Sequence, residues 1–339
     1  MMNVIGIESS CDETSVAILS DDELLANLIS SQDFHKEYGG VVPELSSRAH
    51  LQIITPLVKQ ALTKSNLELT DIDLICATAG PGLIGALLVG FTFAKGLALS
   101  LNKPFVPVNH IEGHIFSGFL MDEKPEFPFL TLVVSGGHTL LLLVKSFTEI
   151  VQLGSTIDDA AGEAFDKVAK MLGLQYPGGP KIQELASKSN GTDIKFPIAN
   201  LKRPYDFSFS GVKTSVLRYI QKNSVGDKQL DQKLKNDIAL AFQNAVKGAL
   251  IQNTEKALRE FKVHSISLVG GVAANKSLRD SIISLSNKYG KRSIIPKLEY
   301  CGDNAAMIAF RGMTVFNQGK RFDLSGKPFP HLSKDGFNF

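Results

Sequence analysis

Residues 4–31 of the chain read VIGIESSCDETSVAILSDDELLANLISS, and this stretch indicates the fold. Three apolar runs alternate with polar residues, a pattern that is typical of three short strands joined by turns. Residues 129–156 read FLTLVVSGGHTLLLLVKSFTEIVQLGST and follow the same plan. The sequence therefore predicts that one β-meander occurs twice in the chain.

The elements that follow each meander also correspond. In both halves we expect a helix, a buried strand, a glycine-bearing turn, a second helix and another short strand. Alternating strands and helices with glycine turns predict an α/β architecture. We expect two related lobes that face one another across a cleft, with a single large sheet as the alternative. The expected helices span 43–64, 83–101, 235–261 and 276–288, and the expected strands span 72–79, 104–108, 265–269 and 293–297.

The two lobes are expected to differ in length. The first covers 1–125 and the second covers 126–339, because the matched elements lie farther apart in the second half. The extra residues fall at about 176–233, which hold a proline-glycine loop and a lysine-rich polar stretch. The C-terminal tail can pack back on the first lobe.

Composition sets loose limits on function. The chain has 339 residues, 36 Lys and Arg against 34 Asp and Glu, and a net charge of +2, which neither requires nor excludes a nucleic-acid partner. Its 3 cysteines are far apart and form no CxxC pair, so we expect reduced thiols and a cytoplasmic protein without a secretion signal. The apolar stretch 83–101 contains Lys95 and several glycines, which favours a buried helix over a membrane span.

A pair of histidines is the first candidate for specific chemistry. His110 and His114 lie four residues apart at the expected start of a helix, so both imidazoles share one face and could bind one metal ion. The strand before His110 matches the strand before Asp303, so we expect Asp303 to approach from the opposite lobe. Two histidines and a carboxylate suit Fe²⁺ or Zn²⁺. The alternative for Asp303 is the cap of the helix that starts near Ala305.

Four glycine- or hydroxyl-rich loops suit a ligand that carries phosphate. Each offers backbone N–H groups at the end of a strand or the start of a helix, where anions bind in α/β proteins. Asp12, in the first loop, could hold a cation. None is a Walker loop or a GxGxxG motif, which excludes the ordinary P-loop and dinucleotide folds. The loops are 9–14, 135–139, 176–180 and 270–275.

Four residues near these loops have simpler alternative roles. His138 could be an ordinary turn residue, and Asp166 an ordinary surface aspartate. Asp158 and Asp159 are expected to cap the helix that contains Asp166.

In their order along the chain, these motifs resemble the TsaD/Gcp family. Its members are tRNA N6-adenosine threonylcarbamoyltransferases, once described as O-sialoglycoprotein endopeptidases. The resemblance runs from Ile5 to Met307, and the YPGGP form is typical of bacterial members. The motifs are IGIESSCDET at 5–14, KG at 95–96 with LNKPFV at 101–106 and HIEGHI at 110–115, VSGGHT at 134–139, DDAAGEAFDK at 158–167, YPGGP at 176–180, GGVAAN at 270–275 and GDNAAM at 302–307.

The resemblance implies an actin/Hsp70/sugar-kinase (ASKHA) fold with two duplicated lobes around a cleft. It implies an acyltransferase that moves the threonylcarbamoyl group from threonylcarbamoyl-AMP to N6 of adenosine 37 in tRNAs reading ANN codons. His110, His114 and Asp303 would bind one divalent metal ion per subunit, with Fe²⁺ favoured and Zn²⁺ as the alternative. The residues that would bind the adenylate are Val134, Ser135, Gly136, Gly137, His138, Asp166, Gly179 and Asn275.

Further contacts are expected from the same resemblance and from charge. Ser10, Asp12, Glu13 and Gln183 are additional candidates for substrate binding, although some members carry an acidic residue at the position of Gln183. The expected partners are tRNA, a TsaB-like paralogue that docks on a helical face of the first lobe, and a TsaE-like ATPase. Five basic residues and one tyrosine of the insertion could contact the tRNA backbone. The alternative is that they form a solvated surface. They are Lys195, Lys202, Arg203, Tyr205, Lys213 and Arg218.

Two other functions remain as alternatives. A metal-dependent endopeptidase is suggested by the histidine pair, but such enzymes carry glutamate directly after the first histidine, where this chain has Ile111. An ATP-binding kinase or ATPase of the same fold would not be expected to need the histidine pair.

Overall fold

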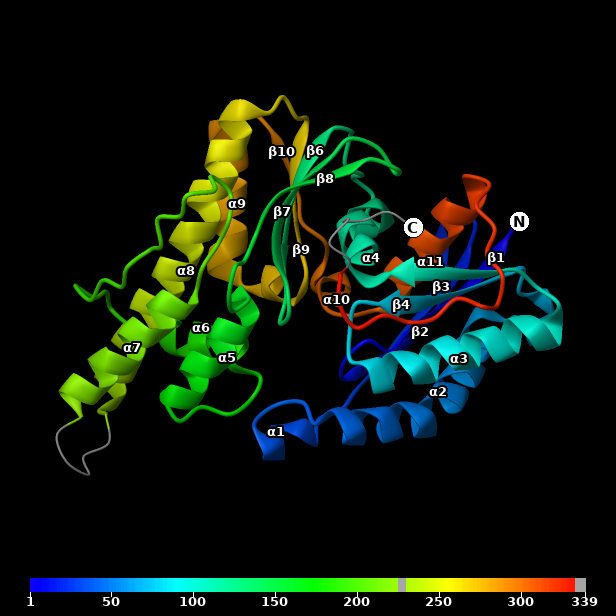
Figure 1. Cartoon of the computed structure of the whole chain (residues 1–339), viewed down its shortest axis with the longest axis horizontal. Coiled ribbons are helices and arrows are strands. Elements are labelled where there is room, and N and C mark those ends of the chain that lie inside the picture. Colours follow the sequence, from blue (N-terminus) through cyan, green and yellow to red (C-terminus); the bar gives the residue numbers. More distant parts are fainter. Residues whose placement is uncertain (225–229, 333–339) are drawn as a thin grey trace. The chain divides into compact units, whose positions relative to one another are not determined.

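The computed structural model describes residues 1–224 and 230–332, and it divides into two compact units. Unit 1 consists of Met1–Lys124 and Pro296–Phe339, and unit 2 consists of Pro125–Ile295. Residues 225–229 of the expected insertion and 333–339 of the expected tail lie outside the described residues. Each unit contains a five-stranded sheet with helices packed on it (Figure 1).

The two sheets have the same topology. In unit 1 the strand order is β3-β2-β1-β4-β5, and in unit 2 it is β8-β7-β6-β9-β10. The first three strands of each unit form an antiparallel meander. The fourth strand pairs parallel with the first, and the fifth pairs parallel with the fourth. The predicted duplication is therefore confirmed. The strands are β1 (Asn3–Glu8), β2 (Glu13–Ser20), β3 (Glu23–Ser31), β4 (Leu74–Gly80), β5 (Phe105–Asn109), β6 (Phe129–Val134), β7 (Thr139–Val144), β8 (Ile150–Ser155), β9 (Ser265–Val269) and β10 (Arg292–Ile294).

The helices of unit 1 cover both faces of its sheet. A Cβ on Gly6 of β1 would lie 2.7 Å from Ala309 N of α11, whereas the side chain of the next residue, Ile7, faces Gly90 of α3. Successive side chains of a strand point to opposite faces, so α11 and α3 cover opposite sides. The helices are α1 (His35–Tyr38), α2 (Pro43–Ser65), α3 (Ile84–Leu101), α4 (His110–Phe116), α10 (Leu298–Cys301) and α11 (Ala305–Asn317), with short 3₁₀ turns at Leu69–Asp71 and Ser117–Leu120.

Unit 2 carries the helices that surround the predicted nucleotide loops. The expected insertion at about 176–233 holds two of them, α6 and α7, joined by an extended segment. The helices are α5 (Ala161–Met171), α6 (Gly178–Ser187), α7 (Ser210–Asn223), α8 (Gln232–Glu260) and α9 (Lys276–Lys288), with a 3₁₀ turn, η3, at Gly271–Ala274.

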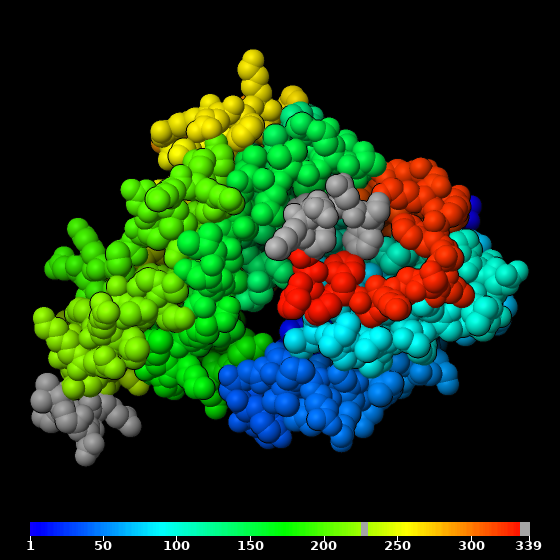
Figure 2. All heavy atoms as spheres, in the orientation of Figure 1, coloured from blue at the N-terminus to red at the C-terminus, as the bar shows by residue number. Residues whose placement is uncertain are grey.

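The end of the chain belongs to unit 1, which corrects the expected boundary of the second lobe at residue 339. The physical reason is that the first sheet needs a cover on its second face, and α11 supplies it through close contacts with β1. The segment after α11 also packs on this unit, where Phe329 N donates to Ala79 O at 2.8 Å. Figure 2 shows this segment in red against α3 in cyan, where Lys95 Nζ donates to Gly326 O at 3.1 Å.

Among the described residues, α3 alone is long and apolar enough to cross a membrane by length and composition. One side of the helix packs into the core of unit 1 through Phe91, Ala94 and Ala98. Other apolar side chains of the helix, Ile84, Leu88 and Leu99, are exposed.

Candidate functional site

The short helix α4 presents the two histidines. It begins at His110 because the Asn109 side chain caps it, with Oδ1 accepting from Ile111 N at 2.9 Å and Glu112 N at 3.3 Å. The four-residue spacing brings the ring centroids of His110 and His114 to 4.7 Å. Both side chains are buried.

Asp303 completes a cluster of possible metal ligands. Its Oδ1 lies 3.4 Å from His110 Nε2 and 3.1 Å from His114 Nε2. One ligand atom from each of the three residues lies within 4.8 Å of the others. Asp303 belongs to the same unit as the histidines, so the expectation that it comes from the opposite lobe is wrong.

The alternative role of Asp303 as a helix cap is also wrong. Asn304 caps α11, with its Oδ1 accepting from Met307 N at 3.1 Å. The carboxylate of Asp303 is therefore not used as a cap and instead faces the two imidazoles.

Glu8 is a site residue that sequence reasoning missed. It lies at the end of β1, is fully buried, and places Oε2 3.0 Å from His110 Nδ1. Thr78 Oγ1 donates to the same oxygen at 2.6 Å, and Ser10 N donates to Oε1 at 2.5 Å. A carboxylate behind a ligating histidine fixes the ring so that its other nitrogen faces the metal. The sequence feature that could have identified Glu8 is an acidic residue at the end of an otherwise apolar strand.

The charges of this cluster favour a bound cation. Burial opposes ionisation of Glu8 and Asp303, but the charge and hydrogen bonds of His110 outweigh burial, and both pKa values are lowered. Burial lowers the pKa of His110, but the carboxylates of Asp303 and Glu8 raise it well above its usual value. Burial, followed by the charges of Asp303 and Asp12, raises the pKa of Glu13 to about 9. Two nitrogens and one carboxylate oxygen beside further acidic groups fit a divalent transition-metal ion.

The predicted nucleotide residues of unit 2 come from neighbouring elements. Val134 ends β6, and the turn to β7 closes with Ser135 N donating to His138 O at 2.8 Å. The start of α5 packs on this turn, where Gly162 N donates to Ser135 O at 3.2 Å. One turn later Asp166 Oδ1 accepts from Gly178 N at 2.7 Å, which ties α5 to the start of α6. This tie gives Asp166 a specific structural role beyond that of a surface aspartate.

Several glycines of these loops border open space. A Cβ on Gly136, Gly137, Gly179 or Gly271 would meet no atom of the structure within 4 Å. Gly270 differs, because its φ is +92° and a Cβ there would lie 2.5 Å from Val134 O. The packing of the chain therefore explains why residue 270 is a glycine. The other four glycines leave room for a ligand beside the backbone.

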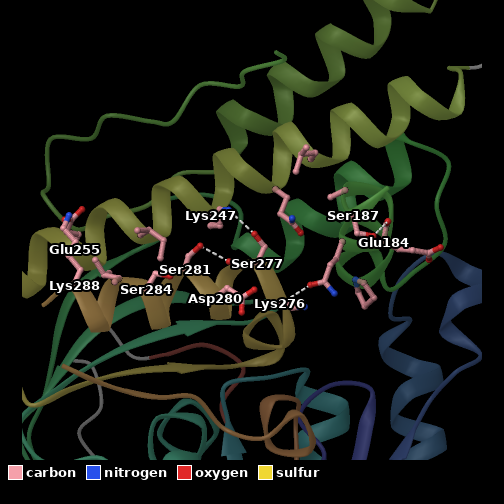
Figure 3. A pocket seen from close by; sticks show the side chains of 17 residues that line it. Glu184, Ser187, Lys247, Glu255, Lys276, Ser277, Asp280, Ser281, Ser284 and Lys288 are labelled. Atoms are coloured by element: carbon pink, nitrogen blue, oxygen red, sulfur yellow. Dashed lines mark hydrogen bonds and ion pairs between the residues drawn. The ribbon is translucent and has the colours of Figure 1, made fainter. Parts of the chain in front are cut away.

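A groove of about 910 Å³ runs between α6, α8 and α9 of unit 2 (Figure 3). One end is lined by Pro180, Gln183 and Lys276, which are close in sequence to Gly179 and Asn275. Gln183 Oε1 accepts from Lys276 N at 2.6 Å and so links α6 to α9. Asn275 caps α9 through Leu278 N at 3.0 Å, and its Nδ2 donates to Gln243 Oε1 at 2.9 Å. Of the candidate adenylate residues, Gly179 and Asn275 are thus the direct sequence neighbours of residues that line this groove, whose volume is in the range of small-molecule sites.

Asp158 and Asp159 do not cap α5, which corrects that expectation. The capping position is Ala160, and no side chain caps this helix end. Asp158 Oδ1 accepts from Phe209 N at 2.8 Å, while its Oδ2 accepts from Ser210 Oγ at 2.7 Å. Asp159 binds Lys167 at 2.8 Å and also binds Lys213. Both aspartates hold the start of α7, which lies within the insertion.

The six candidate tRNA contacts are not equally accessible. Tyr205 is buried and donates to Glu260, and Lys213 is ion-paired with Asp159. The other four residues, Lys195, Lys202, Arg203 and Arg218, are exposed.

Known proteins resemble this chain over nearly its full length. Residues 23–310 match the family described as TsaD: tRNA N6-adenosine threonylcarbamoyltransferase. A protein of that name from Thermosipho africanus is 50% identical over 98% of this chain and 99% of its own length. Another, from Clostridium botulinum, is 46% identical over 98% of this chain and 97% of its own length.

Solved structures agree on the fold. HypF of T. kodakarensis has a TM-score of 0.64 at 17% identity and covers 94% of this chain and 48% of its own. Component A of the Acidaminococcus fermentans (R)-2-hydroxyglutaryl-CoA dehydratase has a TM-score of 0.55 at 16% identity, over 92% of this chain and 96% of its own. These likenesses and the duplicated sheets confirm the ASKHA fold. With the family match over residues 23–310 and relatives up to 50% identical, the chain belongs to the TsaD family.

Proposed function

We propose that this protein transfers the threonylcarbamoyl group from threonylcarbamoyl-AMP to N6 of adenosine 37 in tRNAs that read ANN codons, and releases AMP. The observation that carries the proposal is the His110–His114–Asp303 cluster, backed by Glu8. It occurs in a chain 50% identical to a tRNA N6-adenosine threonylcarbamoyltransferase.

In this proposal His110, His114 and Asp303 hold one divalent ion, for which Fe²⁺ is the first candidate and Zn²⁺ the second. Such an ion supplies Lewis-acid polarisation of the carbonyl group that is transferred. Glu8 keeps His110 turned so that Nε2 faces Asp303. Ser10, whose Oγ lies 3.3 Å from His110 Nδ1, and the acidic residues Asp12 and Glu13 remain candidates for contacts to the threonine end.

The loops of unit 2 would bind the adenylate. The turn from Val134 to His138 offers backbone N–H groups beside the open Gly136 and Gly137, which suits a phosphate. Asp166 would fix the start of α6, and with it Gly179, because its Oδ1 accepts a hydrogen bond from Gly178 N. Asn275 at the start of α9 would face the nucleoside, while Gln183 mainly links α6 to α9.

The transfer step needs one bond to form and one to break. The N6 amine of adenosine attacks the carbamoyl carbon, the bond from that carbon to the phosphate oxygen of AMP breaks, and the amine loses one proton. Among the described residues none is placed unambiguously as a general base, so we assign that proton to the leaving phosphate. The protein's main contribution is then to hold both reactants in place.

The tRNA would contact the exposed basic residues of the insertion, Lys195, Lys202, Arg203 and Arg218. Phosphate contacts make affinity fall with salt in proportion to their number. Changing Lys202 and Arg203 together to alanine should weaken tRNA binding and flatten its salt dependence. Unchanged affinity and salt dependence would exclude this surface.

Protein partners are proposed on the helical face of unit 1. Leu51 of α2 is 65% exposed, and Ile84 and Leu88 of α3 are 45% and 47% exposed. Large exposed apolar side chains on adjacent helices are typical of protein interfaces. We propose that a TsaB-like paralogue docks there, that a TsaE-like ATPase assists, and that the complex acts in the cytoplasm.

The endopeptidase alternative is not favoured. Ile111 occupies the position where a zinc protease carries its glutamate, and Glu112 is paired with Arg311. One assay separates the functions: AMP release from threonylcarbamoyl-AMP should require tRNA and should be lost in His114→Ala. Peptide hydrolysis or ATP phosphotransfer by the same preparation would favour the alternatives.

The cellular test is mass analysis of tRNA from cells depleted of this protein. We expect loss of threonylcarbamoyl-adenosine. Retained modification, in cells without a second copy of the enzyme, would refute the proposed function.

A further inference from the structure

Glu112, between the two histidines of α4, forms a buried ion pair with Arg311 of α11. Arg311 Nε donates to Glu112 Oε2 at 2.7 Å, and Nη2 lies 2.6 Å from the same oxygen. The side chain of Glu112 is only 4% exposed and that of Arg311 only 6%. The guanidinium group of Arg311 lies 4.6 Å from the ring centroid of Phe116, which also belongs to α4.

The ion pair belongs to the contacts between α4 and the segment that starts at Asp303, which include the following three. The first is Asp303 with the histidines, and the second is Met307 against Gly113, where a Cβ would lie 3.1 Å from Met307 Cγ. The third is the ion pair at Arg311. Met307 and Arg311 are four residues apart and so lie on one side of α11, while Asp303 directly precedes Asn304, the cap of this helix. Rotation or sliding of α11 on α4 would move all three contacts together.

A buried ion pair is not expected to stabilise a protein more than apolar side chains of similar volume. Here Arg311 also keeps Nη1 buried without a hydrogen-bond partner among the described residues, which is unfavourable. Stability alone therefore does not account for the pair. What it does provide is a directional contact between the two helices.

We infer that Glu112 and Arg311 are positioning residues for the metal centre, because they hold α11 in the register that places Asp303 against His110 and His114. This inference rests on the proposed metal site. Neither residue touches the cluster directly, so its effect on metal binding acts through the packing of α11 on α4.

The test is titration of the metal-free full-length protein with Co²⁺, followed by its visible absorption and by competition with a chromophoric chelator. Glu112→Gln keeps the volume and removes the charge, and the double change Glu112→Met with Arg311→Met removes both charges. We expect both to bind Co²⁺ more weakly, by up to about tenfold, because the effect is transmitted through packing and not through a hydrogen bond to a ligand, and to show altered absorption bands. The control is Met313→Ala, which weakens the packing of α11 and leaves the pair intact.

Met313→Ala should lower the melting temperature but bind Co²⁺ like the unsubstituted protein. Unchanged Co²⁺ affinity and absorption in Glu112→Gln would overturn the inference. If the double variant does not fold, the result for Glu112→Gln alone tests the inference. An equal loss of affinity in Met313→Ala would also overturn it, because affinity would then follow general stability. If the unsubstituted protein binds no Co²⁺, or His114→Ala binds it equally well, the metal site itself fails and the inference falls with it.

Discussion

At the scale of single residues, His110 of α4 is paired with a carboxylate from strand β1. Glu8 is fully buried and would be an unfavourable residue in that position without its partners. It has three of them: His110, Thr78 and the backbone of Ser10. His110, one of the three proposed metal ligands, is therefore held by a second layer of hydrogen bonds, which begins at the end of β1.

Glu8→Gln should weaken metal binding by about tenfold, because a neutral amide holds His110 less firmly than a carboxylate does. Competition with a chromophoric chelator measures the change. Glu37→Gln, at an exposed glutamate of α1, is the matched control and should have no effect. Wild-type affinity in Glu8→Gln would show that the orientation of His110 does not depend on this carboxylate.

At the scale of secondary-structure elements, the start of α6 leaves open space beside its backbone at Gly179. Gly179 is the second residue of α6, just as Gly211 is the second residue of α7, and a Cβ on either would meet no atom within 4 Å. The two glycines are equivalent for folding. They differ because Gly179 lies beside the candidate adenylate residues, whereas Gly211 does not.

Gly179→Ala should therefore weaken binding of an AMP probe without loss of stability. Alanine in a helix is favoured over glycine by up to about 1 kcal/mol, so the melting temperature should stay level or rise. Gly211→Ala should give the same thermal result with unchanged AMP affinity. Equal AMP affinity in both variants would place the nucleotide elsewhere.

Contacts between the loop that precedes α5 and the start of α7 also attach the insertion to the rest of unit 2. Asp158 accepts from Phe209 N and from Ser210 Oγ and so holds the start of α7. Asp158→Ala should increase amide hydrogen exchange at residues 207–213, whereas exchange in β6 and β7 should stay as it is. Unchanged exchange at 207–213 would mean that Asp158 is not needed to anchor the insertion.

At the scale of the whole molecule, each unit has its own sheet, but their boundaries are not sequential. Unit 1 takes α11 from the end of the chain, and α11 covers the face of the sheet that carries Gly6. Residues 125–295 form the other unit without that helix.

A fragment of residues 125–295 should therefore fold alone with cooperative unfolding. A fragment of residues 1–124 should not, because the sheet face covered by α11 would be exposed to water. Circular dichroism during thermal unfolding checks both. A cooperative transition in the 1–124 fragment would contradict the need for α11.

The sequence by itself determined the parts of this protein that depend on local pattern. The alternation of apolar residues predicts both meanders, and the four-residue spacing predicts that His110 and His114 share a helix face. The glycine loops likewise indicate where a phosphate can approach. These features follow from the periods of strands and helices, which involve only neighbours in the chain.

Only the tertiary structure decided the long-range partners. It brought Asp303 to the histidines within one unit, gave the cap of α11 to Asn304, and turned Asp158 towards the insertion. It also revealed Glu8 behind His110. These pairings follow from which helix can cover which sheet face, and small residues such as Gly6 and Gly113 allow that close approach. That choice depends on packing between segments distant in sequence, so local pattern did not predict it.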